Sequence, residues 1–412
     1  MNPTSTSPTR DPVSERIAGI GQDLIDAFGR VLDGIPAAAR GPQALATELG
    51  LDKVLCSRLL KAIKKSRDPL AAVHHLPGPD PLARFLRAAR KAKVDKADTD
   101  AAAAAAEALK AFVRDELGDR GSLEVLVSTW LPEVRREFEL RRKQSAYRAM
   151  SQLNGLSVRV RLATVLVAPS ATPGRLDLIW VMGFFGLRSL RPGATAGLST
   201  QRMVTEAEGE GAPRHPDALE GPGGAHPDGY RLDQFCESKA AEIVTETHGE
   251  WTHHRLAGVG IGPASEVDLV LCEVNRAELP DSVPVGSNRM AHFSSAISTP
   301  TKLLLFDTLV HRDVYGAAAP ELRLYDGVQG GSPDINDPAN EAYRMHLAET
   351  LTPLGSDPAN FRSDAIGSYQ ELLRHVFDRL GWDPTAFVGH RARIEYPLLG
   401  TIAVQAFRPP QR

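Results

Sequence analysis

The stretch that decides the fold of the N-terminal part is QALATELGLDKVLCSRLLKAI, residues 43–63. Two short segments with helical apolar periodicity flank Gly50, and glycine readily adopts the positive φ that a tight turn between two helices requires. Ala46 supplies a small side chain where the helices approach, and Asp52 stands where an N-cap opens the second helix. The expected shared core consists of Leu45, Leu49, Leu51, Cys56 and Leu59. The stretch predicts a helix-turn-helix.

This pattern resembles the helix-turn-helix of bacterial transcriptional regulators, and its ending CSRLL is most similar to the winged-helix IclR and MarR styles. The resemblance covers about 25 residues, or about 55 if the preceding helix and residues 64–76 form a support helix and a wing. It implies that the second helix lies in the major groove of double-stranded DNA. The C-terminal part resembles no family.

The resemblance assigns roles to the outward-facing residues of this module. An arginine on the second helix can donate bidentately to guanine O6 and N7, whereas lysines that follow it contact phosphates and fix the register. The base-edge candidates are Lys53, Ser57, Arg58 and Lys61, the phosphate candidates are Lys64, Lys65 and Arg67, and the backbone candidates beside the first helix are Thr47 and Arg40. Val54 and Leu55 are apolar where DNA readers expose polar side chains, so they face thymine methyl groups or another helix or chain.

Charge is unevenly distributed along the chain. The 412 residues are 42% hydrophobic and 24% charged with a formal net charge of −3, which is ordinary for a globular protein and excludes a collagenous or wholly disordered chain. Residues 40–93, however, hold twelve basic side chains against four acidic ones. A basic segment on an otherwise acidic chain is typical of a module that binds a polyanion, although a solvated helical surface gives the same count.

The sequence also predicts the compartment. Three widely separated cysteines, Cys56, Cys236 and Cys272, form no disulfide framework and no CxxC metal pair. The longest apolar run, residues 178–187, is half of the ~20 residues that cross a bilayer. The N-terminus lacks the apolar core of a secretory signal. We therefore expect a cytoplasmic protein with no membrane partner.

Periodicity divides the chain at Asn154–Gly155, where the apolar period changes from about 3.6 to 2. The expected organisation is a disordered leader (1–12), a helix-turn-helix module (13–97), a helical spacer or dimerisation region (98–153) and an α+β domain (154–412). Helices are expected at 17–32, 42–49, 53–64, 80–93, 98–117 and 123–152, the last as an exposed spacer. Ser14 is the expected N-cap of the first helix.

The C-terminal part is expected to be rich in strands, at 156–162, 175–185, 266–275, 302–311, 321–325 and 391–407, with one helix at 366–380. In the first strand, Arg159 and Arg161 alternate with apolar residues, as in a half-buried strand. Strands outnumber helices and do not alternate with them, which favours a mixed or antiparallel α+β domain over a Rossmann-type one. Residues 191–229 contain eight glycines and five prolines among 39 residues and predict a flexible insertion.

Candidate catalytic and metal-binding groups are weak. His248, His253 and His254 lack an HExxH frame. The cluster Asp307, His311, Arg312 and Asp313 would allow a general base but has no GxSxG elbow or activated cysteine beside it, so a polar turn is expected. The glycines at 258–262 lack the spacing of a phosphate loop. We expect no enzyme, no catalytic residue, no metal and no cofactor.

These observations predict a sequence-specific DNA-binding transcriptional regulator whose C-terminal domain senses an unknown small-molecule effector or drives oligomerisation. A homodimer is expected because one short recognition helix makes few specific contacts. The alternative is a non-enzymatic structural or assembly protein whose N-terminal helices mediate protein–protein contacts. Val54, Leu55 and the Gly/Pro-rich insertion favour that alternative. An enzyme without a recognisable motif is a third alternative.

Overall fold

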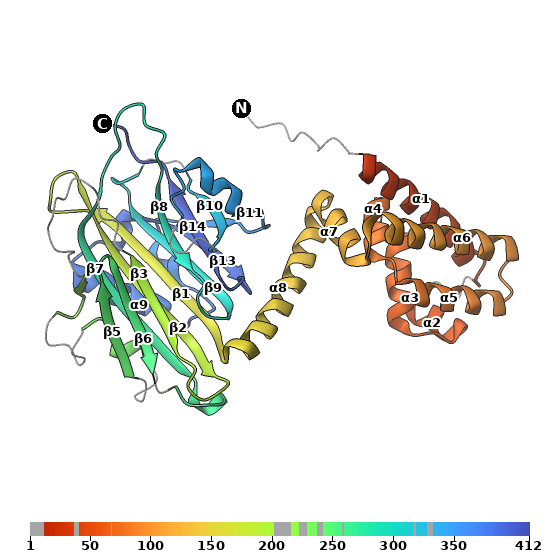
Figure 1. Cartoon of the computed structure of the whole chain (residues 1–412), viewed down its shortest axis with the longest axis horizontal. Helices are drawn as coiled ribbons and strands as arrows, with labels where there is room; N and C mark the ends of the chain where they lie inside the picture. Colours follow the sequence, from red (N-terminus) through yellow and green to blue (C-terminus); the bar gives the residue numbers. More distant parts are fainter. Residues whose placement is uncertain are drawn as a thin grey trace. The chain divides into compact units, whose positions relative to one another are not determined.

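The computed structural model describes residues 12–36, 41–66, 68–201, 216–221, 229–236, 242–257, 259–315, 319–327 and 333–412. The chain forms two compact units, Met1–Glu139 and Leu140–Arg412. The first unit is helical and the second is rich in strands, so the expected α+β class is confirmed (Figure 1). The expected leader lies outside the described residues except for Pro12, which begins the first helix.

The helical unit is built around α1, whose apolar stripe includes Ile17, Leu24 and Phe28. Ser14 is buried inside α1 and does not cap it, because the helix already begins at Pro12. The helices of this unit are α1 (Pro12–Asp33), α2 (Pro42–Leu49), α3 (Lys53–Leu60), α4 (Pro69–His75), α5 (Pro79–Lys91), α6 (Lys96–Phe112), α7 (Arg120–Trp130) and α8 (Pro132–Asn154). Single π-helical turns, Lys61–Lys65 and Val113–Leu117, extend α3 and α6.

The wing expected within residues 64–76 is not formed, and that expectation is wrong. The segment is helix α4, which Pro69 opens in its first turn and Asp68 caps by accepting a hydrogen bond from the Leu70 amide at 2.8 Å. Leu70 and Val73 then enter the helical core. The apolar spacing that suggests a short strand here is also that of a buried helix of two turns.

The region expected as a spacer is largely part of the first core. Leu109 and Phe112 of α6 and Leu123 and Val127 of α7 are buried in the cluster that α1 organises. The helix expected at 123–152 is divided into α7 and α8 at Leu131–Pro132, because proline is tolerated at the start of a helix but not in its interior. The boundary between the two units falls within α8, earlier than the expected change at 154.

The second unit contains a seven-stranded sheet in the order β12-β13-β9-β1-β2-β7-β4. Neighbouring strands are antiparallel except for β1 and β9, which are parallel, as expected for a mixed sheet. The strands are β1 (Leu156–Pro169), β2 (Arg175–Ser189), β4 (Asp217–Ala218), β7 (Val267–Pro280), β9 (Thr301–His311), β12 (Leu351–Gly355) and β13 (Phe387–Glu395).

Two further sheets accompany it (Figure 1). One has the order β11-β10-β14-β8 and consists of β11 (Arg344–Met345), β10 (Glu321–Asp326), β14 (Thr401–Phe407) and β8 (Ala291–Ala296). The other has the order β3-β6-β5 and consists of β3 (Ala196–Gln201), β6 (Trp251–Ala257) and β5 (Glu242–His248). Among the described strands, β8 and β3 are edge strands of these two sheets, as are β11 and β5.

Both faces of the seven-stranded sheet are covered. Helix α9 (Tyr369–Leu380) packs on one face, against residues such as Leu162 and Val181. On the other face, the four-stranded sheet covers Val165 and its neighbours, and the three-stranded sheet covers Phe184 and its neighbours. The second unit is therefore layered, with a helix on one side of the central sheet and two smaller sheets on the other.

Most strand expectations are confirmed, with three differences. The segment 391–407 is part of two strands, β13 and β14, in different sheets. The expected insertion 191–229 contains strand β3, whose Ala196 and Leu198 are buried, so that part of it is a core element. Arg161 is only 7% exposed, although its position in a half-buried strand predicts a solvent-facing side chain. Arg159 is exposed as expected.

The sequence does not predict strands β5, β6 and β8.

Within the described residues, no helix combines the length and apolar character needed to span a bilayer.

Candidate nucleic-acid interface

A tight turn joins α2 to α3. Gly50 ends α2 in the left-handed region (φ 62°, ψ 38°), where a side chain would be strained. Asp52 then caps α3, and its carboxylate accepts hydrogen bonds from the amides of Val54 at 2.7 Å and Leu55 at 3.2 Å. Leu45 and Ala46 of α2 are buried, as are Leu55, Cys56 and Leu59 of α3. The turn and cap are those that the sequence predicts.

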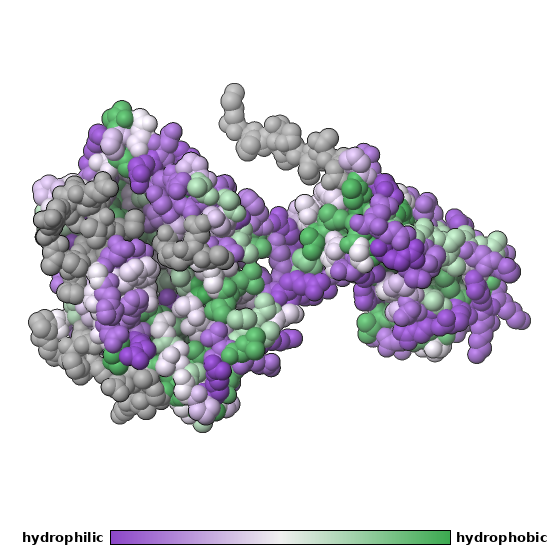
Figure 2. Space-filling model, in the orientation of Figure 1, coloured by the Kyte–Doolittle hydropathy of each residue, from purple (hydrophilic) through white to green (hydrophobic). Residues whose placement is uncertain are grey.

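The outer face of α3 carries polar side chains in a row. Lys53, Ser57 and Lys61 are exposed and follow one another at intervals of four residues, which places them on one side of the helix. Lys65 is also exposed. Within the described part of the chain, none of the three lysines forms a salt bridge. Hydrophilic residues are prominent on the surface of the helical unit (Figure 2). We call Lys53, Ser57 and Lys61 the α3 row.

Other expected contact residues are engaged within the unit. The Lys64 ammonium lies 2.6 Å from a carboxylate oxygen of Asp33, and the Thr47 hydroxyl donates to the carbonyl of Gln43 at 3.1 Å. An exposed ion pair of this kind contributes less than about 1 kcal/mol, so a phosphate can displace Asp33. Arg40 and Arg67 lie outside the described residues.

Arg58 is held beside a second arginine that the sequence analysis missed. Its guanidinium donates to the carbonyl of Leu76 at 3.4 Å, and Arg120 of α7 donates to the same oxygen at 2.6 Å. The carbonyl lies just after α4, where no wing is formed, so no local pattern in the sequence indicates this meeting. The geometry places two guanidinium groups around one backbone acceptor.

The electrostatics around this carbonyl are positive. The pKa of His75 is lowered to about 4, first by burial and then by the charges of Lys61, His74 and Arg58, against the opposing effect of Glu137. His75 is therefore neutral at pH 7 and adds no charge of its own. Its pKa is lowered first by burial, and the neighbouring cations add to that effect.

The two apolar residues on α3 differ in exposure. Val54 is 64% exposed, whereas Leu55 is 7% exposed and belongs to the buried face of the helix. Only Val54 is therefore available to contact a thymine methyl group or another protein. For Leu55, burial agrees with the expected alternative of packing against another helix or chain rather than with exposure to thymine methyl groups.

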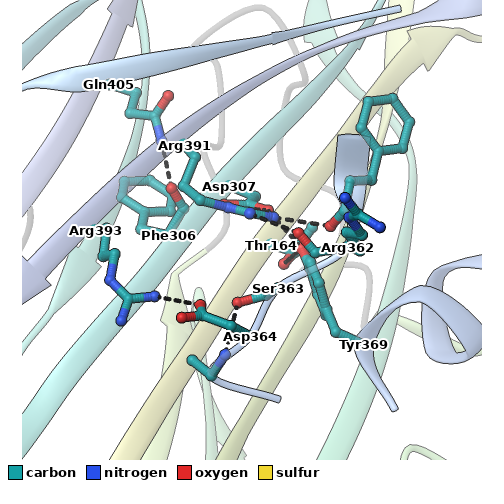
Figure 3. A network of polar contacts seen from close by, with 12 residues as sticks. Thr164, Phe306, Asp307, Arg362, Ser363, Asp364, Tyr369, Arg391, Arg393 and Gln405 are labelled. Atoms are coloured by element: carbon teal, nitrogen blue, oxygen red, sulfur yellow. Dashed lines mark hydrogen bonds and ion pairs between the residues drawn. The ribbon is translucent and has the colours of Figure 1, made fainter. Parts of the chain in front are cut away.

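The polar cluster around Asp307 in the second unit has a structural role (Figure 3). Asp307 is fully buried, and its carboxylate accepts from Arg391 at 2.7 and 2.9 Å and from the Tyr369 hydroxyl at 2.8 Å. Arg391 also donates to the carbonyls of Phe361 and Arg362, both at 2.8 Å. Burial raises the pKa of Asp307, and the bonds from Arg391 and Tyr369 oppose that rise. The network ties β9 and β13 to α9.

The residues grouped with Asp307 in the sequence analysis lie elsewhere. His311 lies 3.7 Å from the exposed Asp313 and has no contact with the Asp307 carboxylate among the bonds of the described residues. Arg312 donates to the carbonyl of Thr385 at 2.7 Å. The expected polar turn is therefore formed only by His311, Arg312 and Asp313, whereas Asp307 is a buried residue of β9.

The histidines of the β5–β6 hairpin point to different partners. His253 is 2.8 Å from the Ser199 hydroxyl, and His254 is buried between Thr245 and Glu273, at 2.9 and 2.6 Å. In the described parts of the chain, no three His, Cys, Asp or Glu side chains are grouped so that they could hold a metal ion.

Cys56 and Cys272 are buried thiols, and burial raises the pKa of each. Gly258 lies outside the described residues.

Comparison with known proteins adds no family. The chain matches no protein-family model, no curated protein and no solved structure. Any function assigned to this chain is therefore inferred from its own residues and their geometry.

Proposed function

We propose that this protein is a cytoplasmic, sequence-specific DNA-binding transcriptional regulator that acts as a homodimer. The observation that carries the proposal is the α3 row, two exposed lysines and a serine on a short helix that a tight glycine turn positions. The second unit would sense an effector or support assembly. Charge supports the same division, since the basic residues are concentrated in the segment 40–93 of a chain with a net charge of −3.

The chemistry of the α3 row suits a groove of duplex DNA. Lys53 and Lys61 are separated by about two helical turns, or ~12 Å, so each can approach a phosphate or base edge as the helix enters the major groove. Ser57 between them is small enough to permit close approach. Arg58 would exchange its long hydrogen bond to Leu76 for a bidentate contact to guanine. Two protomers would double these contacts.

The first test is selection of bound duplexes from a random pool, followed by affinity measurement on the selected sequence. The variant Lys53→Gln/Lys61→Gln is expected to lose affinity about 300-fold at 0.2 M salt, because two counterion-releasing contacts disappear from each protomer of the dimer. The control Lys110→Gln/Lys302→Gln removes the same charge from α6 and β9, and its affinity is expected to be unchanged. Equal losses in both variants, or no selected sequence, would overturn the proposal.

Arg58→Ala tests sequence recognition separately. Loss of a bidentate guanine contact costs about 1–3 kcal/mol on the selected site and leaves non-specific binding nearly unchanged. The ratio of the two affinities should therefore fall. An unchanged ratio would remove Arg58 from the recognition surface.

A second candidate function is assembly through protein–protein contacts at α3. The observation that favours it is Val54, an apolar side chain 64% exposed within the cationic face. Sedimentation of the full chain without nucleic acid distinguishes the candidates. Large assemblies that Val54→Ser dissolves would support assembly, whereas a dimer unaffected by Val54→Ser would support the regulator.

A further inference from the structure

A cavity lies in the second unit, on the side of the central sheet opposite α9. Its volume is about 310 Å³, within the range of ~300–1,000 Å³ typical of small-molecule sites. Strands β1, β2 and β7 form its floor, and the edge strands β8 and β3 of the two smaller sheets contribute to its walls. The Ser298 hydroxyl reaches the carbonyl of Gly197 at 3.4 Å and so joins the segment after β8 to β3. The cavity is therefore a space between two sheets over a third.

An unpaired buried cation lines this cavity. Arg161 of β1 is 7% exposed, and its Nε and Nη1 atoms are buried without a hydrogen-bond partner among the described residues. Its guanidinium lies 5.3 Å from the ring centre of Phe184, a favourable contact that satisfies none of its N–H groups. Burial lowers the pKa of Arg161 to about 10, so the group remains charged at pH 7. A buried charge of this kind destabilises the empty protein.

A second buried polar group of the cavity lining also lacks a hydrogen-bond partner among the described residues. Ser295 of β8 also lines the cavity, is 4% exposed, and its hydroxyl has no partner among the described residues. A hydroxyl can donate to an anion that a guanidinium binds. Polar groups buried without partners are rare in folded proteins, and two of them lining one cavity indicate an absent ligand that supplies acceptors.

The acidic residues lining the cavity limit the charge of that ligand. Glu273 of β7 is already engaged, because it accepts from the Thr200 hydroxyl at 2.7 Å and lies 2.6 Å from His254 Nε2. Glu278 adds a second carboxylate to the lining. Burial is the largest cause that lowers the pKa of His292, which leaves it neutral at pH 7. Arg161 is thus the cation of the lining that has no acceptor among the described residues, while further negative charge on a ligand would meet Glu273 and Glu278, which favours a monoanion over a dianionic phosphate.

The rest of the lining is largely apolar. The side chains of Leu178, Trp180 and Met182 from β2 contribute to the floor, and Trp251, Phe293 and Ile297 contribute to the walls. Such walls favour an apolar or aromatic body, since its transfer from water gains about 25 cal/mol per Å² of buried surface.

We propose that this cavity binds a small organic carboxylate with an apolar body, whose carboxylate accepts two hydrogen bonds from Arg161 and one from Ser295. A carboxylate binds a guanidinium bidentately through Nη2 and either Nε or Nη1, so it would satisfy one of the two orphaned Arg161 atoms directly. The inference deepens the sensor part of the proposed function and rests on it for its regulatory meaning. Because binding is measured without DNA, failure of the ligand site and failure of DNA binding are distinguishable.

The test uses the full chain and defined probes. Phenylacetate and octanoate are compared with their amides, with phenyl phosphate and with inorganic phosphate, by calorimetry and by the temperature of unfolding. At least one carboxylate is expected to bind and to raise the unfolding temperature of the wild type, whereas its amide does not. Arg161→Met should weaken that binding about 100-fold, and Ser295→Ala about fivefold. The control Arg159→Met, an exposed position of the same strand, should bind as the wild type does.

Each other outcome overturns the proposal. Binding of phosphates alone would assign a different ligand class, and binding that Arg161→Met leaves intact would place the ligand elsewhere. No effect of either carboxylate on the wild type would also reject it. A second readout covers structural failure: without ligand, Arg161→Met should unfold at a higher urea concentration than the wild type, because the unpaired charge is gone. A lower midpoint would show that Arg161 has a structural partner.

Discussion

The two units of this protein place their cations differently. The helical unit keeps Lys53, Lys61 and Lys65 on its surface, whereas the strand-rich unit has a partly buried Arg391 and a buried Arg161 on opposite faces of one sheet. Within the second unit, the contrast is sharper still. Arg391 has a carboxylate, a phenol ring and two carbonyls around it, whereas among the described residues Arg161 contacts an aromatic ring and lines a cavity without a hydrogen bond from its Nε or Nη1.

Positively charged side chains therefore have three different roles in the two units. An exposed lysine remains hydrated and does not lower the stability of the fold, and it remains available to a polyanion in solution. A buried arginine with its partners in place fixes the position of strands and a helix. A buried arginine without a partner lowers the free energy of unfolding of the ligand-free protein. A ligand that supplies an anion to this arginine raises that free energy again.

The largest effect is expected from removing the carboxylate partner of Arg391. Asp307→Ala leaves that arginine and the Tyr369 hydroxyl without their shared acceptor, and the free energy of unfolding should fall by about 3–5 kcal/mol. Urea unfolding of the second unit measures the loss. The matched Asp313→Ala removes an exposed carboxylate and should change stability by less than about 0.5 kcal/mol. Equal effects of both would break the distinction between buried and exposed charges.

Removing the unpaired arginine should have the opposite sign. Arg161→Met replaces a buried charge with an apolar side chain of similar length, and the free energy of unfolding without ligand should rise by about 1–3 kcal/mol. Arg391→Met, by contrast, should lower it. If both substitutions lower the free energy of unfolding to the same degree, Arg161 and Arg391 have the same role in stabilising the fold.

A smaller effect is expected in the helical unit. Asp52→Ala removes the cap that accepts from the amides of Val54 and Leu55 and should destabilise this unit by about 1 kcal/mol. It should also weaken DNA binding, because α3 is no longer held at its first turn. Glu48→Ala, an exposed carboxylate on α2, serves as the control. Far-ultraviolet circular dichroism during urea unfolding reports the change, and a loss no greater than that of the control would contradict it.

The smallest effect concerns pH. Since the pKa of His75 is lowered to about 4 in the folded chain, the unfolded chain binds more protons between pH 6.5 and pH 4. Stability of the helical unit should therefore fall as pH decreases through this interval, and His75→Gln should reduce the slope. Bound DNA should raise the pKa of His75 by neutralising Lys61 and Arg58. Unfolding curves at pH 7 and pH 5 test the first statement, and an unchanged slope in the variant would contradict it.

Local signals in the sequence predict much of the surface that we propose for DNA binding. Gly50 and Asp52 act through φ and through hydrogen bonds two or three residues away, so the turn and the cap follow from the residue types. Alternation likewise predicts β1 as a strand. It cannot show that Arg161 is buried, because the sheets that cover it come from residues more than 30 positions away. The Asp307–Arg391 pair, 84 positions apart, escapes detection for the same reason.

The salt dependence of binding to the selected duplex tests the central claim about the α3 row most directly. Fluorescence anisotropy between 50 and 300 mM salt gives the slope of log affinity against log salt concentration, which is about −0.9 for each phosphate contact. Lys53→Gln/Lys61→Gln should make that slope shallower by about 3.6, since each protomer of the dimer loses two contacts, while Lys110→Gln/Lys302→Gln should leave it unchanged. A wild-type affinity independent of salt, or a slope that the two lysines do not change, would contradict DNA binding by α3.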